Sequence, residues 1–227
     1  MRVKVVVFDV DGVLTEVDSS WGFVHRALGV EERAREIANM FERGEISYEE
    51  WMRLDTQLWL EATGGRITRW DLERILSAIP IRREAPDVAR CLHSMGKRIA
   101  LVSGGIDLLV SRVASVVGAE LWVANQLSFD KTWRLVPGGL PVVGVDKARA
   151  LRRVLWELRA EPDEAMYVGD SRWDVDAMRV VAYPVAMGSD PTVLSVAKYR
   201  VESLGELCDL VRKIEKGDLE VTGPSGP

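Results

Sequence analysis

The sequence has few of the residues that build disulfide frameworks or histidine metal sites. Its 227 residues include two cysteines, Cys91 and Cys208, and two histidines, His25 and His93. Neither cysteine lies in a CxxC motif, so we expect no disulfide framework and a cytoplasmic location. With so few histidines, a histidine-based metal site is not expected either.

Long apolar runs and basic clusters are also missing. No run is long enough to span a bilayer, and the first residues lack the apolar stretch and cleavage site of a signal peptide. The formal net charge is -5, and lysine and arginine form no dense cluster. These features argue against membrane and nucleic acid partners, and we expect a monomer or homodimer.

Amide side chains are scarce as well, and they are confined to Asn39, Asn125, Gln57 and Gln126. Depletion of these thermolabile residues, with 29% charged residues, favours a thermophilic source. Compositional drift would leave the same pattern.

What the chain does contain is a series of short apolar segments separated by helix-like stretches. Buried strands are predicted at residues 3–8, 98–102, 121–124, 165–168 and 181–186. Strands that alternate with helices indicate an α/β fold with a doubly wound, mainly parallel sheet of the Rossmann-like type.

Residues 16–80 interrupt this alternation, because they show amphipathic helical patterns and no buried strand. We therefore predict a core domain formed by residues 1–15 and 81–215, with a small helical cap domain at 16–80 inserted after the first strand. A β-hairpin is predicted within 125–144, where ProGlyGly interrupts alternating polar and apolar residues. Residues 216–227 are predicted to be a disordered tail.

Two carboxylates follow the first predicted strand, in the segment PheAspValAspGlyValLeuThr at residues 8–15. Asp9 and Asp11 would emerge at the edge where α/β sheets bind ligands, and Gly12 would allow a tight turn with exposed N–H groups. An Asx-rich turn without chemistry is the alternative. The segment LeuValSerGlyGly at residues 101–105 ends a second strand with Ser103 and Gly104, which suit a phosphate at a helix N-terminus. The alternative role of Ser103 is a helix cap.

Two further elements lie downstream. Lys147 opens a predicted helix, where a solvated surface lysine is the alternative. Asp170 follows another apolar strand, and Asp174 comes four residues later. Carboxylates at a strand end hold Mg²⁺ through oxygen ligands, although acidic residues also decorate helix N-termini to suit the dipole.

These four elements, in this order and each after a predicted strand, resemble the four motifs of the haloacid dehalogenase (HAD) superfamily. The resemblance covers residues 3 to about 211, and residues 16–80 resemble that family's small helical cap. LeuValSerGlyGly, the AlaAsnGlnLeu segment at 124–127 and the cap position look most like archaeal phosphoserine-phosphatase-like hydrolases.

The resemblance implies a Mg²⁺-dependent phosphomonoesterase for a small phosphorylated metabolite. Asp9 would be the nucleophile that forms an aspartyl-phosphate, and Asp11 the general acid and base. Asp9, Asp11 through its carbonyl, and Asp170 would hold Mg²⁺, with Asp174 binding through water or orienting Lys147. Phosphate would be bound by Ser103, Gly104, Gly12 and Lys147.

The cap departs from the phosphoserine phosphatase pattern. Asp18 stands where the resemblance implies a substrate-binding glutamate, and Asp55 where it implies an arginine that binds the substrate carboxylate. Arg53 and Asp18 are the expected substrate contacts, with ordinary solvated charges as the alternative. Trp173 replaces an expected asparagine, and Trp21, His25 and Trp173 are the next candidates. Phosphoserine-like substrates are favoured, and a sugar or nucleotide phosphate is the alternative.

Other activities fit less well. Asp11 argues against a dehalogenase, because a halide leaves without protonation. Phosphonate cleavage would need a Schiff-base lysine from the cap, and residues 16–80 contain no lysine. A non-catalytic phospholigand-binding protein is the remaining alternative, although all four motifs are intact.

Overall fold

The computed structural model describes residues 3–218, and a seven-stranded sheet forms its centre. The strands lie in the order β4-β3-β2-β1-β5-β6-β7, and all neighbours are parallel except β3 and β4. Their bounds are β1 (Val5–Phe8), β2 (Arg98–Ile106), β3 (Leu121–Phe129), β4 (Leu135–Leu140), β5 (Ala165–Gly169), β6 (Tyr183–Met187) and β7 (Tyr199–Val201). The mainly parallel α/β sheet confirms the predicted fold class.

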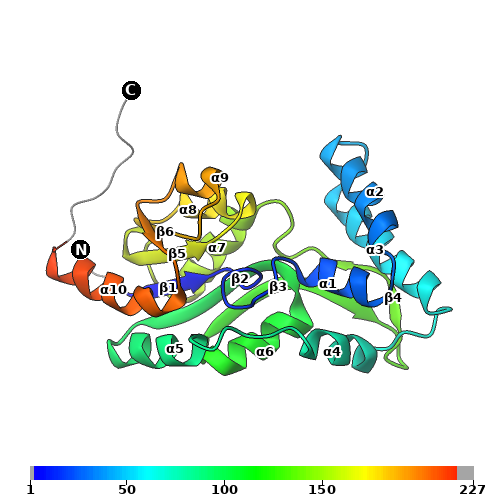
Figure 1. Ribbon diagram of the computed structural model, residues 1–227, viewed down its shortest axis with the longest axis horizontal. Helices are drawn as coiled ribbons and strands as arrows, with labels where there is room; N and C mark the ends of the chain where they lie inside the picture. The colour runs from blue at the N-terminus through cyan, green and yellow to red at the C-terminus, as the bar shows by residue number, and fades with distance from the viewer. Residues whose placement is uncertain (1–2, 219–227) are drawn as a thin grey trace.

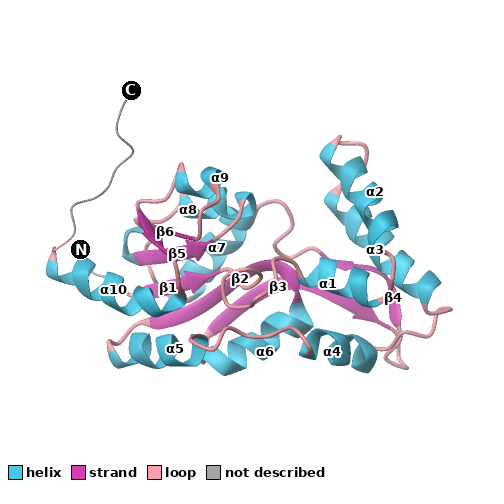
Figure 2. Ribbon diagram, viewed as in Figure 1, coloured by secondary structure: helices cyan, strands magenta, loops and turns pink. Residues whose placement is uncertain are grey.

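Helices cover both faces of this sheet (Figures 1 and 2). One face carries α5 (Ala85–Ser94) and α6 (Asp107–Val117), and the other carries α7 (Lys147–Glu157), α8 (Val175–Met178) and α9 (Pro191–Leu194). Along β1, Val6 and Phe8 belong to one hydrophobic cluster while Val5 and Val7 belong to the other. The unbroken apolar run that predicted this strand therefore reflects burial on both faces.

Five helices lie between β1 and β2, and the first four lie beyond the carboxyl ends of the central strands (Figure 1). These four are α1 (Ser20–Ala27), α2 (Glu31–Glu42), α3 (Tyr48–Ala62) and α4 (Arg69–Ser77). The predicted hairpin is formed by β3 and β4, and it contacts this insertion. Gly138 N donates to Thr56 Oγ1 over 2.7 Å, and Thr68 forms an isolated bridge with Arg134. The hairpin thus extends the insertion, and the domain division at 16–80 stays a prediction.

The carboxyl-terminal elements were not predicted. β7 is short, and α10 (Leu207–Lys216) packs beside α5. Of the tail predicted to be disordered, residue 216 ends α10 and Asp218 N donates to Lys213 O over 3.0 Å. The remainder of that tail lies outside the described residues.

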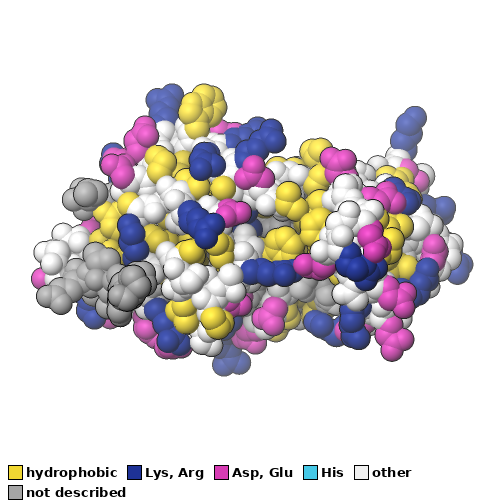
Figure 3. Space-filling model, turned by 90° about the horizontal axis from the view of Figure 1, so that it is seen from above, with side chains coloured by type: hydrophobic (Ala, Val, Ile, Leu, Met, Phe, Trp, Pro, Cys, Tyr) yellow, Lys and Arg dark blue, Asp and Glu magenta, His cyan; other side chains and the backbone are white. Residues whose placement is uncertain are grey.

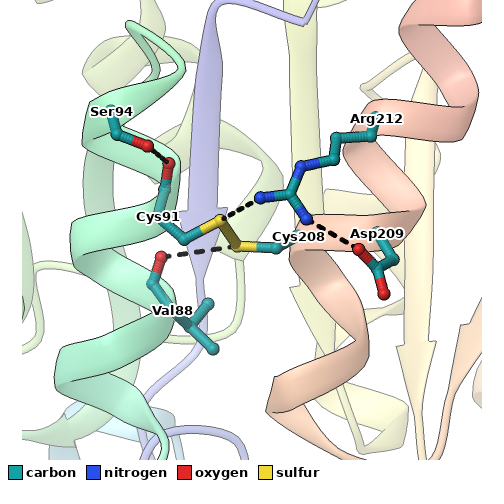
Figure 4. Close-up of a disulfide and its surroundings, with 6 residues drawn as sticks. All are labelled: Val88, Cys91, Ser94, Cys208, Asp209 and Arg212. Atoms are coloured by element: carbon teal, nitrogen blue, oxygen red, sulfur yellow. Dashed lines mark hydrogen bonds and ion pairs between the residues drawn. A yellow bond between two sulfur atoms is a disulfide. The ribbon is translucent and has the colours of Figure 1, made fainter.

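A disulfide joins Cys91 of α5 to Cys208 of α10 (Figure 4). No disulfide framework was expected, and this single bridge was not predicted from the sequence. They are 117 residues apart in sequence, and only the packing of α10 against α5 brings them together. Arg212 lies beside the bridge, with Nη2 3.4 Å from Cys91 Sγ and Nη1 2.7 Å from Asp209 Oδ1.

Surface charges of both signs are interspersed on the face seen in Figure 3, where no broad patch of one sign is visible. Within residues 3–218, no helix combines the length and apolar character that crossing a membrane requires.

Candidate active site

The sequence-predicted residues converge at the carboxyl ends of three neighbouring strands. Asp9 follows β1, Ser103 and Gly104 lie near the end of β2, and Asp170 follows β5. β1 lies between β2 and β5 in the sheet, so these ends share one edge. A cavity of about 180 Å³ opens there between the sheet and the inserted helices.

Lys147 joins two carboxylates at the floor of this cavity. Its Nζ lies 2.8 Å from Asp9 Oδ2 and 2.7 Å from Asp174 Oδ1. The lysine side chain is only 5% exposed, so it is not the solvated surface residue of the alternative interpretation. Burial disfavours its charge, but Asp174 and Asp9 outweigh this and raise the pKa of Lys147 above its usual value. The ammonium stays charged and holds both carboxylates in place.

Asp174 is fixed by five hydrogen bonds. Its Oδ1 accepts from Lys147 Nζ at 2.7 Å and from the Tyr167 hydroxyl at 2.8 Å. Its Oδ2 accepts from the N–H groups of Asp170 and Ser171 at 3.0 and 3.1 Å, and from Ser171 Oγ at 3.3 Å. Burial opposes its charge, but Lys147 and these bonds hold the pKa of Asp174 below its usual value. With its oxygens engaged in this way, Asp174 is built to orient Lys147.

Asp11 is held apart from this network by Ser20 of α1. The Ser20 N–H and hydroxyl both donate to Asp11 Oδ2, each over 2.7 Å. Burial raises the pKa of Asp11, and the two Ser20 bonds offset part of that rise. Asp11 Oδ1 is buried and has no hydrogen-bond partner among the described residues. The free oxygen leaves the carboxyl group able to exchange a proton with a bound molecule.

Asp9 and Asp170 form the group that suits a cation. One carboxylate oxygen each from Asp9, Asp170 and Asp174 lies within 4.8 Å of the others. Burial and the neighbouring charges raise the pKa of Asp9 to about 7 and that of Asp170 to about 8, although Lys147 acts in the opposite direction on both. Asp170 Oδ1 is buried without a hydrogen-bond partner in the described chain. Hard oxygen ligands with uncompensated charge fit a divalent cation such as Mg²⁺.

Three glycines allow the loops to approach this closely. A Cβ on Gly12, whose φ is +76°, would overlap Asp170 Oδ2, and one on Gly169 would overlap Asp174. On Gly105 it would lie 2.8 Å from both Asp11 Oδ2 and Ser20 Oγ. Side chains at these positions would push the carboxylates apart.

Ser103 and Gly104 line the cavity opposite Lys147, as predicted. Ser103 is 1% exposed, and its Oγ accepts from Gly105 N at 3.1 Å. Asn125 braces this loop, because its Nδ2 donates to Gly104 O at 2.8 Å and its Oδ1 accepts from Val143 N at 3.1 Å. The backbone that would cradle a phosphate is therefore tied to the loop that precedes Lys147.

Two predicted site residues are placed elsewhere. The N–H of Gly12 donates to Val17 O over 2.7 Å, so it is not presented to a phosphate, and the glycine serves close packing against Asp170. Arg53 is directed away from the cavity and binds both oxygens of Glu50 at 2.7 and 2.8 Å. Helical geometry explains this second outcome, because Arg53 lies on a different side of α3 from Asp55, which does line the cavity.

The wall of the cavity formed by the insertion is aromatic and acidic. Trp21, Tyr48 and Trp51 come from α1 and α3, and Trp173 comes from the core. Trp51 and Trp173 lie with ring centroids 6.4 Å apart, so they meet across the boundary between insertion and core. Asp18 also lines the cavity, at its exposed edge.

Sequence reasoning missed Ser20, Tyr48 and Tyr167. Tyr167 lies inside an apolar strand, and no pattern in that strand indicates that its hydroxyl reaches Asp174. Ser20 lies beside the helix cap, because Ser19 accepts from Gly22 N at 3.0 Å, and no local pattern indicates that Ser20 reaches Asp11. Tyr48 receives a hydrogen bond from Asn125 Nδ2 at 2.9 Å, a contact across 77 residues that no local pattern reveals.

Comparisons with known proteins agree with this geometry. Residues 3–181 match the model of the haloacid dehalogenase-like hydrolases. A protein of Idiomarina loihiensis named phosphoserine phosphatase is 27% identical over 220 residues, which cover 94% of each chain. One of Albidiferax ferrireducens with the same name is 28% identical over 211 residues, 89% of this chain and 86% of that protein.

Solved structures share the fold. A phosphoserine phosphatase in apo form superposes with a TM-score of 0.75 at 20% identity, covering 94% of this chain and 98% of that one. A substrate-bound phosphoserine phosphatase superposes with a TM-score of 0.74 at 20% identity, covering 95% and 99%. On the match of residues 3–181 to the family model, the chain belongs to the haloacid dehalogenase-like hydrolases.

Proposed function

We propose that this hydrolase is a Mg²⁺-dependent phosphomonoesterase that acts through a phosphorylated Asp9. The observation that carries the proposal is the difference in environment between two carboxylates that lie two residues apart in the sequence. Asp9 is paired with Lys147, whereas Asp11 is held separately by Ser20. A nucleophile and a general acid need this difference in environment.

In the first step, a carboxylate oxygen of Asp9 attacks phosphorus and the bond from phosphorus to the alcohol oxygen breaks. Asp11, whose pKa burial raises, gives its proton to the departing alkoxide. Ser103, the Gly104 N–H and Lys147 bind the phosphoryl oxygens. The positive charge of Lys147 offsets the repulsion between the anionic ester and Asp9.

In the second step, water attacks the phosphorus of the aspartyl-phosphate. Asp11, now a carboxylate, accepts a proton from that water, and Asp9 leaves as a carboxylate with inorganic phosphate as product. Helices α1 to α4 would limit access of other water molecules while the ester is bound.

The carboxylates of Asp9 and Asp170 and the carbonyl of Asp11 would hold Mg²⁺, with Asp174 orienting Lys147. The unpartnered Asp170 Oδ1 and the raised pKa values of Asp9 and Asp170 support this assignment. Bound Mg²⁺ supplies positive charge that stabilises the phosphoryl group during transfer.

The substrate is a small phosphorylated metabolite, with a phosphoserine-like ester favoured because relatives across most of this chain's length carry the name phosphoserine phosphatase. A sugar or nucleotide phosphate is the second candidate, since the chain departs from the expected pattern at Asp55 in the inserted helices and at Trp173 in the core. The intact Asp9, Asp11 and Lys147 set argues against a non-catalytic phospholigand-binding role.

We also propose a cytoplasmic location in a thermophilic organism. The scarcity of asparagine and glutamine supports thermophily. The Cys91–Cys208 disulfide means that cysteine usage no longer supports a cytoplasmic location by itself. A cytoplasmic location is still compatible with the disulfide, because intracellular proteins of hyperthermophiles also contain disulfides.

Phosphate release from p-nitrophenyl phosphate tests the proposed activity. Purified protein should release phosphate with Mg²⁺ and stop when a chelator is in excess. No release with any phosphate ester would leave only the binding role, and full activity in the chelator would contradict the metal assignment.

A further inference from the structure

We infer that the leaving group of the natural substrate is an amino alcohol with a cationic nitrogen and no carboxylate, recognised by Asp55 and the aromatic wall of the cavity. This inference rests on the proposed phosphatase function and narrows its substrate class.

Asp55 is a buried acid that the chemistry of phosphate transfer does not use. It lies on α3, is 4% exposed and lines the catalytic cavity. Its Oδ1 has no hydrogen-bond partner among residues 3–218. A buried carboxylate oxygen without a hydrogen-bond partner is costly, so its presence at a cavity wall indicates a partner that arrives from outside.

The neighbour of Asp55 does not neutralise its charge. Trp59 Nε1 donates to His25 Nδ1 over 2.9 Å, so Nδ1 must be the unprotonated nitrogen. The imidazole is therefore neutral, and its Nε2–H points to Asp55 Oδ2 at 3.4 Å. Burial raises the pKa of Asp55, and His25 and Trp51 lower it only in part. The Trp59–His25 pair orients the carboxylate and leaves its negative charge for a ligand.

The charge of the cavity wall excludes a second anionic group on the ligand. Lys147 is the one cationic side chain among the described residues that line the cavity, and Asp9 and Asp174 already bind it. Arg53, the other expected cation, binds Glu50 with two nitrogens outside the cavity. A substrate carboxylate would meet Asp18 and Asp55 without a partner, which opposes its binding.

The aromatic side chains favour a cation over a neutral hydroxyl. Trp21, Tyr48 and Trp51 line the same wall as Asp55. Tyr48 and Asp55 lie on α3 about two helical turns apart, and both line the cavity. Aromatic faces attract ammonium and quaternary ammonium groups, and a desolvated pair of this kind contributes roughly 2 kcal/mol.

Asp55 also borders a second hollow between α1, α2 and α3, together with Trp21 and Trp51. The residues that line both cavities are Ser19, Trp21, Trp51 and Asp55, and they form the partition between that hollow and the catalytic cavity. A ligand nitrogen bound at the partition would therefore sit at the end of the cavity formed by the inserted helices, while its phosphate lies at Asp9.

A panel of phosphate esters tests the inference on the wild-type protein with Mg²⁺. O-phosphoethanolamine and phosphocholine carry the cation alone, phosphoserine adds a carboxylate, and glycerol phosphate is neutral at the leaving group. We expect kcat/KM for one of the first two to exceed that for phosphoserine and for glycerol phosphate at least tenfold. Which of the two is better distinguishes a primary from a quaternary ammonium. Phosphoserine as the best ester, or equal rates with glycerol phosphate, would overturn the inference.

p-Nitrophenyl phosphate separates this failure from failure of the proposed function. If it is hydrolysed while phosphoserine is preferred, the phosphatase assignment stands and the inference on the leaving group is wrong. If no ester is hydrolysed, p-nitrophenyl phosphate included, both the phosphatase assignment and the inference on the leaving group are wrong.

Variants then test Asp55 itself. Asp55→Asn keeps an oxygen for His25 Nε2–H but removes the charge, so KM for the best cationic ester should rise at least tenfold with little change on p-nitrophenyl phosphate. Glu49→Gln is the matched control, because it removes one negative charge from an exposed position of the same helix. Equal losses on both substrates with Asp55→Asn would mean a structural role and would overturn the assignment of this residue.

Discussion

Ser20 donates two hydrogen bonds to one oxygen of Asp11, from its backbone N–H and from its hydroxyl, each over 2.7 Å. The same hydroxyl accepts from Ile106 N at 3.1 Å, so the first residue of α1 links Asp11, the proposed general acid, to the end of β2. The orientation of Asp11 therefore depends on where the inserted helices begin.

We predict that Ser20→Ala lowers kcat on an alkyl phosphate by roughly tenfold, about 1.4 kcal/mol of transition-state stabilisation. Both Ser20 bonds lower the pKa of Asp11, so loss of the hydroxyl should move the basic limb of the pH–rate profile to higher pH. Ser19→Ala is the control, because it removes the cap of α1 but no hydrogen bond to Asp11, and it should leave that limb in place. An unmoved limb in Ser20→Ala would show that the hydroxyl does not tune Asp11.

The two catalytic carboxylates should respond differently to amide substitution. Asp9→Asn should abolish turnover of every phosphate ester, because the nucleophile is lost. Asp11→Asn should reduce it by roughly 10²- to 10⁴-fold for alkyl esters, and less for aryl esters whose leaving group needs little protonation. Hydrolysis by Asp9→Asn at the wild-type rate would rule out the covalent mechanism.

The strands and the position of Asp9 at a strand end were predictable because each lies in a local pattern. Val5 to Phe8 form an apolar run, and Asp9 follows it directly. The direction of Arg53 was not predictable in the same way, since residues two positions apart on a helix face different sides. Helix boundaries cannot be predicted from sequence to within one residue. The sequence therefore could not indicate that Ser20, and not Ser19, donates hydrogen bonds to Asp11.

The remaining contacts depend on tertiary packing. Cys91 and Cys208, or Tyr48 and Asn125, are neighbours only because distant helices and strands meet. No spacing in the sequence indicates such pairs, and two isolated cysteines without a motif usually stay unpaired.

Stability of the metal-free protein should depend on pH through Asp9 and Asp170. Their pKa values of about 7 and about 8 in the folded protein lie above the usual 3.8, so the folded state binds more protons than the unfolded state between these limits. A raised carboxyl pKa stabilises the fold at low pH, and this stabilisation is lost as the pH rises through the folded pKa. We therefore predict that Tm without metal falls between about pH 5 and about pH 8.

Mg²⁺ should reverse this trend, because it binds the deprotonated carboxylates. The increase in Tm caused by Mg²⁺ is expected to grow over the same pH range, as thermal unfolding with and without a chelator would show. Asp170→Asn serves as the control and should flatten both curves. A metal-free Tm that rises with pH in wild type and falls in Asp170→Asn would contradict the assignment.

The disulfide should stabilise the protein by closing a loop of 117 residues between α5 and α10. We predict that Cys91→Ser lowers the free energy of unfolding by about 2–4 kcal/mol, measured by denaturant titration without reductant. Reductant should lower the wild-type value by a similar amount and leave Cys91→Ser unchanged. Catalysis should be unaffected, since the bridge joins α5 to α10 and neither cysteine lines the catalytic cavity. No difference between wild type and variant would mean that the bridge does not constrain the unfolded chain.

The last prediction separates two cap residues that the sequence had grouped together. Asp18 lines the cavity at its exposed edge, whereas Arg53 binds Glu50 outside it. Asp18→Ala should lower kcat/KM for the best alkyl ester by roughly tenfold, about 1.4 kcal/mol, and affect a small aryl phosphate much less. Arg53→Ala should change kcat/KM for either substrate by less than twofold and should cost less than about 1 kcal/mol of stability, as the loss of an exposed ion pair does.

Asp18 also raises the pKa values of Asp11 and Asp170 through its charge. If Asp18→Ala lowered kcat/KM equally for both substrates, Asp18 would act through Asp11 or the metal site and not by contacting the leaving group. If Arg53→Ala lowered kcat/KM for the alkyl ester alone, the Arg53 side chain would have to move into the cavity when substrate binds.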